Sequence, residues 1–222
     1  MRDGVPLAGL TTLRVGGPAA VLAECTSTAS LVETLRVLDA ADVPTLVVAG
    51  GSNLLITDAG FDGVAVRVAN TGVEMTGNRV LAQAGAVWDE VVAKTVDAGF
   101  GGLECLSGIP GSTGATPVQN VGAYGVEVAT LLRRVQLLDR MTGEVNWVGP
   151  ERLGLGYRTS VLKHRDDALV VAAEFELRED GSSEPLRYRE LAAALDAAEG
   201  DRRPAAEVRA AVLGLRRRKG MV

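Results

Sequence analysis

Cysteine and histidine are scarce in this sequence. Among its 222 residues there are two cysteines, Cys25 and Cys105, and a single histidine. The cysteines form no CxxC or metal-ligand spacing, so the sequence predicts neither a disulfide framework nor a metal site. We expect both thiols to be small core residues of a protein in the reducing cytoplasm. Cys105 lies inside a glycine-rich segment, which leaves open a position beside a ligand.

Surplus positive charge and long apolar runs are also missing. The formal net charge is −5, whereas a nucleic-acid-binding protein needs a dominant basic surface. There is no run of about 18 apolar residues, so we expect no membrane span. The N-terminus lacks the basic start and apolar core of a secretory leader. We therefore expect a cytoplasmic monomer without nucleic-acid or membrane partners, in which a local basic pocket for a small anion remains possible.

The residues that are present predict an α+β protein with a substantial core. Hydrophobic residues make up 47% of the chain, and there are 27 glycines, which suit tight turns and close backbone approaches. Apolar periodicity predicts helices at 28–42, 87–99, 187–200 and 204–220, with Pro204 in the first turn of the last one. Apolar runs predict strands at 45–50, 54–56, 63–69, 78–86 and 168–179, and a pair at 133–149 around a turn at 142–143. We divide the chain into 1–70, 71–178 and 179–222.

A glycine-rich turn separates two apolar runs in LVVAGGSNLLI, residues 46–56. Gly50, Gly51, Ser52 and Asn53 can point several backbone N–H groups into one concavity, a nest that suits phosphate oxygens. Glycine permits the positive φ angles that such a turn needs. A tight hairpin between two strands explains the same residues, so this loop alone does not decide between the two.

Two later segments offer further candidates. The stretch SGIPGSTG, residues 107–114, lies in a long, nearly uncharged, glycine-rich region and can line a buried ligand, although a crossing of close-packed strands would need similar residues. The stretch LGLGYRTSVLKH, residues 153–164, carries Arg158. An arginine fork suits a planar carboxylate, but a solvated surface arginine is the simpler interpretation.

These segments together resemble a known family. In this order and spacing, AGGSNLLITDAGFDGVAV, GGLECLSGIPGSTGATPVQNVGAYGVEV and LGYRTSVLKH are similar to the UDP-N-acetylenolpyruvoylglucosamine reductases, or UDP-N-acetylmuramate dehydrogenases. The likeness runs from TTLRVGG to RRRKG. It implies a two-subdomain FAD-binding module of the vanillyl-alcohol-oxidase (PCMH) type, covering 1–70 and 71–178, followed by the start of a third, substrate-binding α/β domain.

The resemblance also implies a reaction and a set of site residues. NADPH would reduce a non-covalently bound FAD, which would then reduce UDP-N-acetylglucosamine enolpyruvate to UDP-N-acetylmuramate for peptidoglycan synthesis. Arg158 would stabilise the enolate that forms, and Tyr157, Tyr188 and Lys219 would contact substrate. The implied FAD-binding residues are Gly50, Gly51, Ser52, Asn53, Leu54, Ser107, Gly108, Ile109, Pro110, Gly111, Thr113, Gly114, Gln119, Asn120, Gly122, Ala123 and Tyr124.

One part of the family pattern is not found. The resemblance implies a proton-donating serine in an SFF-like motif, and no such motif follows Lys219 before Val222. We therefore expect FAD binding without efficient substrate reduction. The alternatives are an FAD-binding module without catalysis of its own, or a flavin oxidase acting on another substrate. Arg216, Arg217, Arg218 and Lys219 can also simply oppose the dipole of the last helix.

Overall fold

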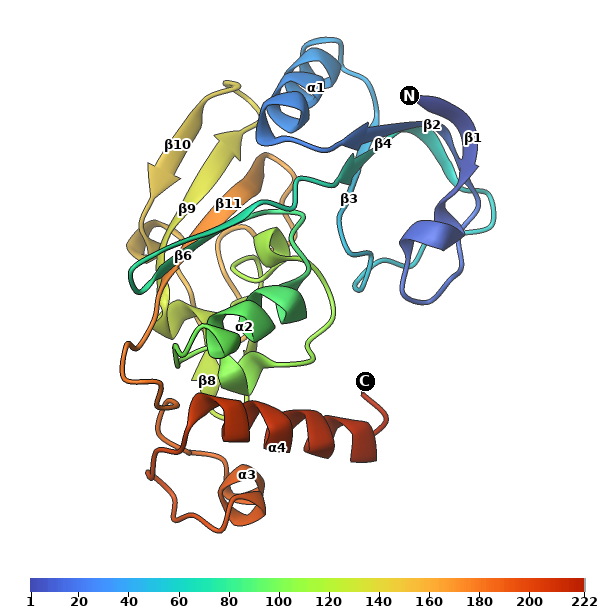
Figure 1. Cartoon of the computed structure of the whole chain (residues 1–222). Helices are drawn as coiled ribbons and strands as arrows, with labels where there is room; N and C mark the ends of the chain where they lie inside the picture. Colours follow the sequence, from blue (N-terminus) through green and yellow to red (C-terminus); the bar gives the residue numbers. More distant parts are fainter. Residues whose placement is uncertain (222) are drawn as a thin grey trace.

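The structure is a computed structural model that describes residues 1–221, and it contains two main sheets (Figure 1). The first is four-stranded, in the order β1-β2-β4-β3. Strand β1 runs antiparallel to β2, whereas β2 and β3 both run parallel to β4. Its strands are β1 (Arg2–Pro6), β2 (Pro18–Cys25), β3 (Thr45–Val48) and β4 (Phe61–Val68).

The second sheet is five-stranded, in the order β10-β9-β11-β6-β5, and every neighbouring pair is antiparallel. Its central strand β11 is buried along most of its length, which explains the continuous apolar sequence of that strand. The five strands are β5 (Val73–Thr76), β6 (Arg79–Gln83), β9 (Leu132–Asp139), β10 (Val145–Val148) and β11 (Ala168–Glu176).

Helix α1 (Thr28–Ala40) lies beside both sheets (Figure 1). It begins with a capping box, in which Ser27 and Ser30 satisfy each other's backbone amides. Its apolar face, at Leu31, Leu35 and Leu38, belongs to a core cluster that also contains residues of β4 and β11. The two sheets are therefore joined by a shared apolar core.

The remaining helices pack around the largest core cluster. Helix α2 (Trp88–Asp97) buries Trp88, whose indole donates to the Leu106 carbonyl at 3.1 Å. Helices α3 (Arg189–Ala194) and α4 (Ala205–Arg218) add apolar residues to this same core, and Figure 1 shows α4 below α2. The short elements are η1 (Leu7–Leu10), η2 (Glu104–Leu106), η3 (Thr113–Ala115), β7 (Gly122–Ala123), β8 (Val126–Glu127), η4 (Val128–Thr130) and η5 (Pro150–Arg152).

Several local predictions need correction. Residues 54–56 are not a strand, because the chain crosses in an irregular loop from the end of β3 to Phe61. The hairpin interpretation of that loop is wrong, since β3 and β4 are parallel and cannot be joined by a tight turn. The helix predicted at 187–200 is only α3, and Pro204 is the N-cap of α4 rather than a residue of its first turn.

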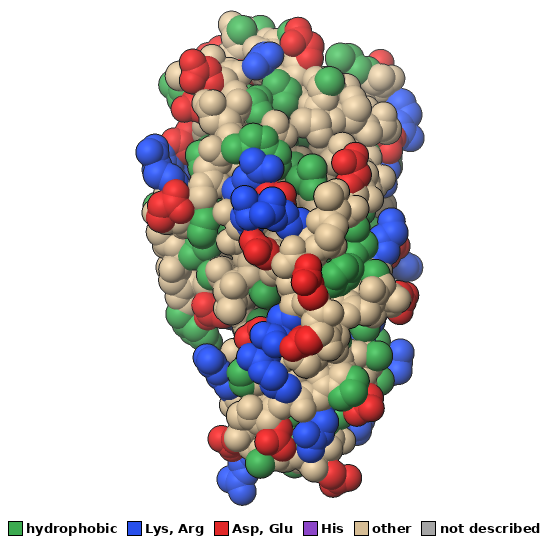
Figure 2. All heavy atoms as spheres, turned by 60° about the vertical axis from the view of Figure 1, so that its left-hand side comes forward, with side chains coloured by type: hydrophobic (Ala, Val, Ile, Leu, Met, Phe, Trp, Pro, Cys, Tyr) green, Lys and Arg blue, Asp and Glu red, His purple; other side chains and the backbone are tan. Residues whose placement is uncertain are grey.

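The surface carries both signs of charge. Figure 2 shows basic and acidic side chains interspersed over the face that it presents. One exposed pair, Arg133 with Glu176 at 3.1 Å, lies on the second sheet. Among residues 1–221, no helix is long and apolar enough to cross a membrane, and no group of three or more acidic, histidine or cysteine residues is arranged to hold a metal ion.

Candidate functional site

The first glycine-rich loop begins where the parallel strand β3 ends. Gly51 has a φ of +61°, and a Cβ placed on it would lie 1.9 Å from the carbonyl oxygen of Leu10. The Gly51 carbonyl accepts a hydrogen bond from the Thr12 amide at 3.1 Å. In the described part of the chain, the amides of residues 50–54 donate to no protein acceptor. The loop is therefore held by packing and by the hydrogen bond that the Gly51 carbonyl accepts, and its backbone N–H donors remain free.

The second glycine-rich loop is tied more tightly to the protein. The amides of Thr113 and Gly114 donate to the carbonyls of Ala86 and Ala84, at 2.8 and 2.9 Å. The Ser107 hydroxyl is buried and donates to the Glu104 carbonyl at 2.6 Å. These three predicted residues can line a ligand with their surfaces, but their donors are already used.

The middle of the second loop keeps free donors. The Gly108 amide donates to Asp89 Oδ1 at 2.7 Å. Beyond it, the amides of Ile109, Gly111 and Ser112 have no acceptor within residues 1–221. Pro110 between them has no N–H. The free donors of this loop are thus concentrated in the few residues that approach the first loop.

The two loops touch each other although they are distant in the sequence. A Cβ on Gly50 would lie only 2.9 Å from the Gly111 Cα, so glycine is needed for this approach. The Ser52 hydroxyl lies 3.5 Å from the Pro110 carbonyl oxygen, at the limit of a hydrogen bond. Free backbone donors from both loops are therefore brought to one place, as a nest for phosphate oxygens requires.

A cavity of about 450 Å³ lies beside this contact; its wall is mainly apolar and includes residues of β3 and β11, with Arg140, Arg165 and Asp166 also on it. Ser112 and Gly114 of the second loop form part of its wall. The Ser112 hydroxyl is buried and, among the described residues, has no hydrogen-bond partner. A buried polar atom without a partner is unfavourable unless a ligand satisfies it. An apolar cavity, free amides and an unsatisfied hydroxyl together fit a dinucleotide cofactor.

The predicted segment 119–124 follows the second loop. The side chain of Asn120 is buried and fully used: it donates to Glu127 Oε2 and to the Gly156 carbonyl and accepts from the Ala129 amide. A cofactor contact of Asn120 would therefore fall to its backbone. Gln119 is half-buried, and Gly122 and Ala123 form the short strand β7 against β8.

The turn that carries Arg158 is fastened to this segment. Asn120 binds the Gly156 carbonyl at 2.9 Å, and the Ser160 hydroxyl donates to the Val118 carbonyl at 2.6 Å. Tyr157 and Arg158 themselves are exposed, with the Arg158 guanidinium 5.8 Å from the centre of the Tyr157 ring. The backbone of the turn is fixed while its arginine remains accessible to an anion.

Tyr124, Tyr188 and Lys219 form a third group of predicted residues. The rings of Tyr124 and Tyr188 meet edge to face with centroids 5.3 Å apart, and Lys219 Nζ lies 6.0 Å from the Tyr188 ring. Lys219 also forms an ion pair with Glu190, which raises the lysine pKa above its ordinary value. Burial raises the pKa of Tyr124, so its phenol stays protonated at neutral pH.

Strained backbone coincides with these positions. Asn120, Tyr124 and Arg158 have φ angles of +43°, +51° and +55°. A positive φ is uncommon for residues other than glycine and persists only where the surroundings enforce it, often at functional sites. Arg14, Asp42, His164 and Asp196 outside the predicted site have similar angles, so the backbone conformation is consistent with a functional role of the three positions but does not single them out.

The cysteines behave as core residues. Both are free and buried. Burial raises the pKa of the Cys105 thiol well above its ordinary value, with help from the neighbouring Glu104 and Glu184 carboxylates. Burial likewise raises the pKa of Glu104. A buried, protonated thiol is unreactive, so Cys105 offers no attachment point for a cofactor.

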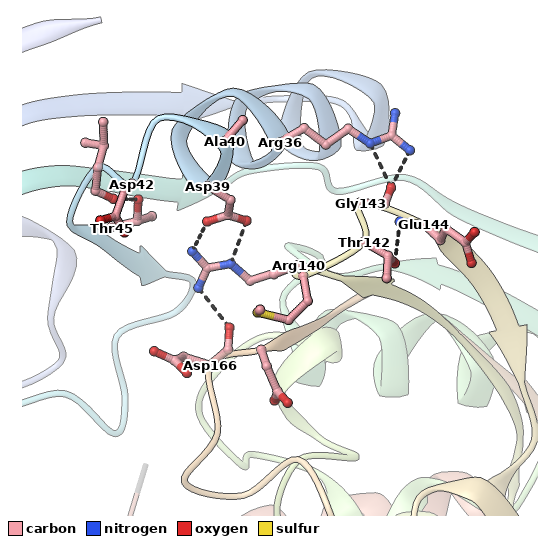
Figure 3. Close-up of a pocket in the computed structure, with 13 residues that line it drawn as sticks. Arg36, Asp39, Ala40, Asp42, Thr45, Arg140, Thr142, Gly143, Glu144 and Asp166 are labelled. Carbon is pink, nitrogen blue, oxygen red and sulfur yellow. Dashed lines mark hydrogen bonds and ion pairs between the residues drawn. The ribbon is translucent and has the colours of Figure 1, made fainter.

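A second, larger cavity of about 790 Å³ lies between α1 and the β9–β10 hairpin (Figure 3). Its two arginines already bind protein groups: Arg36 donates to the Gly143 carbonyl, and Arg140 pairs with Asp39 and donates to the Asp166 carbonyl. Arg140 also borders the apolar cavity. Through these interactions, α1 is joined to the β9–β10 hairpin of the second sheet.

Comparison with known proteins shows the family to which this fold belongs. A family model described as an FAD binding domain matches residues 18–149, which include strands β2 to β10 and both glycine-rich loops. The chain belongs to this FAD-binding family. The FAD-binding residues predicted in the two loops and in segment 119–124 all fall within the match, whereas Arg158, Tyr188 and Lys219 lie beyond it.

Relatives of the FAD-binding chain carry consistent names. It is 72% identical to a UDP-N-acetylenolpyruvoylglucosamine reductase of Nocardia farcinica, over all of this chain and 58% of that protein. It is 56% identical to the reductase of the same name from Mycobacterium tuberculosis H37Rv, over 99% of this chain and 62% of that protein. The chain thus spans about three fifths of the length of these curated relatives. The resemblance found in the sequence is confirmed.

A solved structure agrees with the FAD-binding assignment. The crystal structure of UDP-N-acetylenolpyruvylglucosamine reductase (MurB) from Thermus caldophilus superposes with a TM-score of 0.69 at 27% identity, covering 97% of this chain and 69% of that one. The expected α+β class and the FAD-binding module are therefore confirmed. The division at 70 and 178 and the roles of single residues remain predictions.

The geometry adds candidate residues to those named from the sequence. Ser112 lies within the predicted stretch 107–114 but is not among the individually named residues, and its burial without a partner marks it as a candidate. The apolar runs of β3 and β11 predict strands but not a cavity wall, since an apolar strand looks the same in sequence whether it faces a core or a ligand. Asp89, which binds the Gly108 amide, has no local sequence signal at all.

Proposed function

We propose that this FAD-binding chain serves the NADPH-dependent reduction of UDP-N-acetylglucosamine enolpyruvate to UDP-N-acetylmuramate, a step of peptidoglycan precursor synthesis. The observation that carries the proposal is the contact between Gly50 and Gly111, where free amides of both loops meet beside an unsatisfied Ser112 hydroxyl. The names of the relatives supply the reaction and its substrates.

The loops would hold the cofactor without a covalent bond. Amides of residues 50–54 and of Ile109, Gly111 and Ser112 would donate to the diphosphate, whose negative oxygens suit such a nest. The apolar cavity would take an uncharged part of the dinucleotide, and the Ser112 hydroxyl would find its missing partner there. Charge-assisted hydrogen bonds of this kind contribute roughly 1.5–3 kcal/mol each.

The protein would orient the reactants and stabilise charge, while bound FAD supplies hydride transfer between NADPH and the vinyl group of the substrate. Arg158, exposed on its fixed turn, would bind the substrate carboxylate and stabilise negative charge that develops next to it. Tyr157 beside it would cover the same face. Gly122 and Ala123 offer no bulky side chain, which leaves room for substrate and nicotinamide.

A second anion site would bind the diphosphate of the substrate. Lys219 and Tyr188 lie together at the end of α4, and Tyr124 packs against Tyr188. The phenols are hydrogen-bond donors and the ammonium is a compact cation, a combination that binds phosphate oxygens. The ion pair with Glu190 would have to open or be shared when the diphosphate arrives.

The test is a flavin spectrum. The chain, purified and reconstituted with FAD, is expected to show visible flavin absorbance, and NADPH added without oxygen is expected to bleach it. Arg158→Ala should keep the flavin spectrum and the bleaching but bind the enolpyruvate substrate at least about tenfold more weakly. Failure to bind FAD would contradict the proposal. FAD binding without bleaching would favour a cofactor-holding module.

A monomeric state and a cytoplasmic location remain predictions. Sedimentation tests the first of them.

A further inference from the structure

The Gly108 amide of the second loop is bound by a carboxylate that belongs to an ion pair outside the predicted site. We call this amide–carboxylate hydrogen bond the anchor of the loop. Asp89 lies in the first turn of α2, and its Oδ1 accepts the Gly108 amide at 2.7 Å. The same carboxylate is bound by both terminal nitrogens of Arg209, at 2.6 and 3.0 Å. Arg209 belongs to α4 and follows Asp89 by 120 residues. One carboxylate therefore joins α2, α4 and the loop that meets Gly50.

The anchor lies close to the free donors. Gly108 is followed by Ile109, Pro110, Gly111 and Ser112, which include every free amide of this loop within the described residues. Gly108 and Gly111 have φ angles of +70° and +118°, which glycine adopts readily, so this loop keeps one conformation only if other contacts hold its ends. The downstream end is fixed by the Thr113 and Gly114 amides. The upstream end is held by Ser107 and by the bond to Asp89.

The strength of the anchor depends on Arg209. The Arg209 side chain is 16% exposed and that of Asp89 34%, so the pair is only partly screened by water. A bidentate guanidinium fixes both position and orientation of a carboxylate. Arg209 lowers the pKa of Asp89, and the Gly108 amide adds to this, so the carboxylate is ionised at neutral pH. An ionised acceptor binds an amide more strongly than a neutral one does.

Helix α4 carries this arginine together with the proposed anion-binding end. The helix is held by buried Val208, Val212 and Leu215, and Lys219 follows directly after its last turn. A ligand that shifts or steadies the end of α4 therefore also acts on Arg209, and through Asp89 on Gly108. The chain of contacts is short, continuous and made of named hydrogen bonds.

We propose that Asp89 and Arg209 are positioning residues, which hold residues 108–112 in the form that accepts the cofactor diphosphate and couple that form to the docking of α4. This inference rests on the proposed FAD site but names residues outside it. Neither side chain needs to touch the cofactor. Their effect is to keep the free amides of Ile109, Gly111 and Ser112 preorganised, which lowers the entropy lost on binding.

The experiment compares five variants of this chain. Arg209→Gln removes the ion pair, Asp89→Ala removes the acceptor of Gly108, and Asp89→Asn keeps an acceptor oxygen but loses the charge. Arg133→Gln is the matched control, since it breaks an arginine–carboxylate pair on the outer sheet. FAD affinity, measured by fluorescence titration, is expected to weaken about tenfold in Arg209→Gln and Asp89→Ala, less in Asp89→Asn, and not in the control. Arg209→Lys should restore part of the loss.

A second measurement separates positioning from the proposed function. Hydrogen exchange of the Gly108 amide, followed by NMR in protein without FAD, is expected to accelerate at least about tenfold in Arg209→Gln while amides of α1 keep their wild-type rates. Unchanged exchange at Gly108, or equal FAD affinity in Arg209→Gln and Arg133→Gln, would overturn the inference. If wild-type protein does not bind FAD at all, the proposed function fails, while the exchange result still decides on the anchor.

Discussion

The loop at residues 50–54 and the loop at residues 107–114 meet at Gly50 and Gly111, but they are held differently. The first donates no backbone hydrogen bond to the described protein and rests on the Leu10–Thr12 segment. The second is fixed at both ends, at Gly108 and at Thr113–Gly114. A site for a cofactor diphosphate can thus combine one loop that is held mainly by packing with one that is held by hydrogen bonds. The two should respond differently to substitution.

The largest effect is expected where shape alone holds the loop. Gly51→Ala adds a Cβ 1.9 Å from the Leu10 carbonyl oxygen at a φ of +61°, so the loop has to move as a whole. We expect FAD affinity to fall more than about 100-fold, equivalent to ~2.7 kcal/mol. Titration with FAD measures this. Gly77→Ala is the control, because Gly77 has a similar φ of +57° but nothing within 4 Å; equal losses in both variants would contradict the explanation.

A smaller effect is expected at the contact between the loops. Gly50→Ala places a Cβ 2.9 Å from the Gly111 Cα, a backbone overlap that is relieved only if the two loops move apart. We expect FAD to bind about tenfold more weakly with little change in thermal stability. Gly9→Ala, in the η1 segment beneath the first loop, meets no atom within 4 Å and should leave affinity unchanged. Wild-type affinity in Gly50→Ala would mean that the loops do not act together.

Neighbouring hydroxyls in the second loop should have opposite effects on the FAD-free protein. The Ser112 hydroxyl is buried without a partner, so Ser112→Ala should maintain or raise the free energy of unfolding while weakening FAD binding about fivefold. The Thr113 hydroxyl donates to the Ala86 carbonyl at 3.1 Å, so Thr113→Ala should lower that free energy by about 1 kcal/mol. Urea unfolding of both variants gives the comparison. A stability loss in Ser112→Ala would show that its hydroxyl already has a partner.

The smallest effect concerns acid stability. The pKa of Asp89 is lowered mainly by Arg209, so its contribution is fully present above the unfolded value of 3.8 and is lost as the pH falls through the folded value. The difference in unfolding free energy between wild type and Asp89→Asn should therefore stay constant from neutral pH to about pH 5 and shrink below about pH 4. A difference that grows on acidification would contradict this sign.

The sequence was informative where a residue type is demanded by backbone geometry. Gly50, Gly51, Gly108 and Gly111 were recognisable because only glycine fits those turns, and the structure places them at one contact. Arg158 was recognisable only through the family resemblance, since an exposed arginine has no distinguishing pattern. Long apolar strands such as β11 were predicted, because a run of consecutive apolar residues indicates a buried strand.

Other features depend on contacts that no local pattern encodes. The short strands β1 and β5 were not predicted, because five and four residues are too few for a strand period to stand out from the surrounding sequence. The parallel pairing of β3 with β4 follows from the placement of β2 beside them, not from the residues of the connecting loop. Asp89 and Arg209 form an ion pair although 120 positions separate them in the sequence. The residues around each of them predict only an exposed charged side chain.

The support of Gly51 by Leu10 and Thr12 has a practical consequence. The glycine's Cα packs against the Leu10 carbonyl, and its own carbonyl takes the Thr12 amide, so the seat of the loop is a segment about forty residues earlier in the chain. Leu7 of the same segment is fully buried in a core cluster with Ala19 and Leu22 of the first sheet. Replacing residues 7–12 would therefore disturb the first sheet and the proposed phosphate-binding loop together, so a loss of flavin in such a variant would come with a loss of stability.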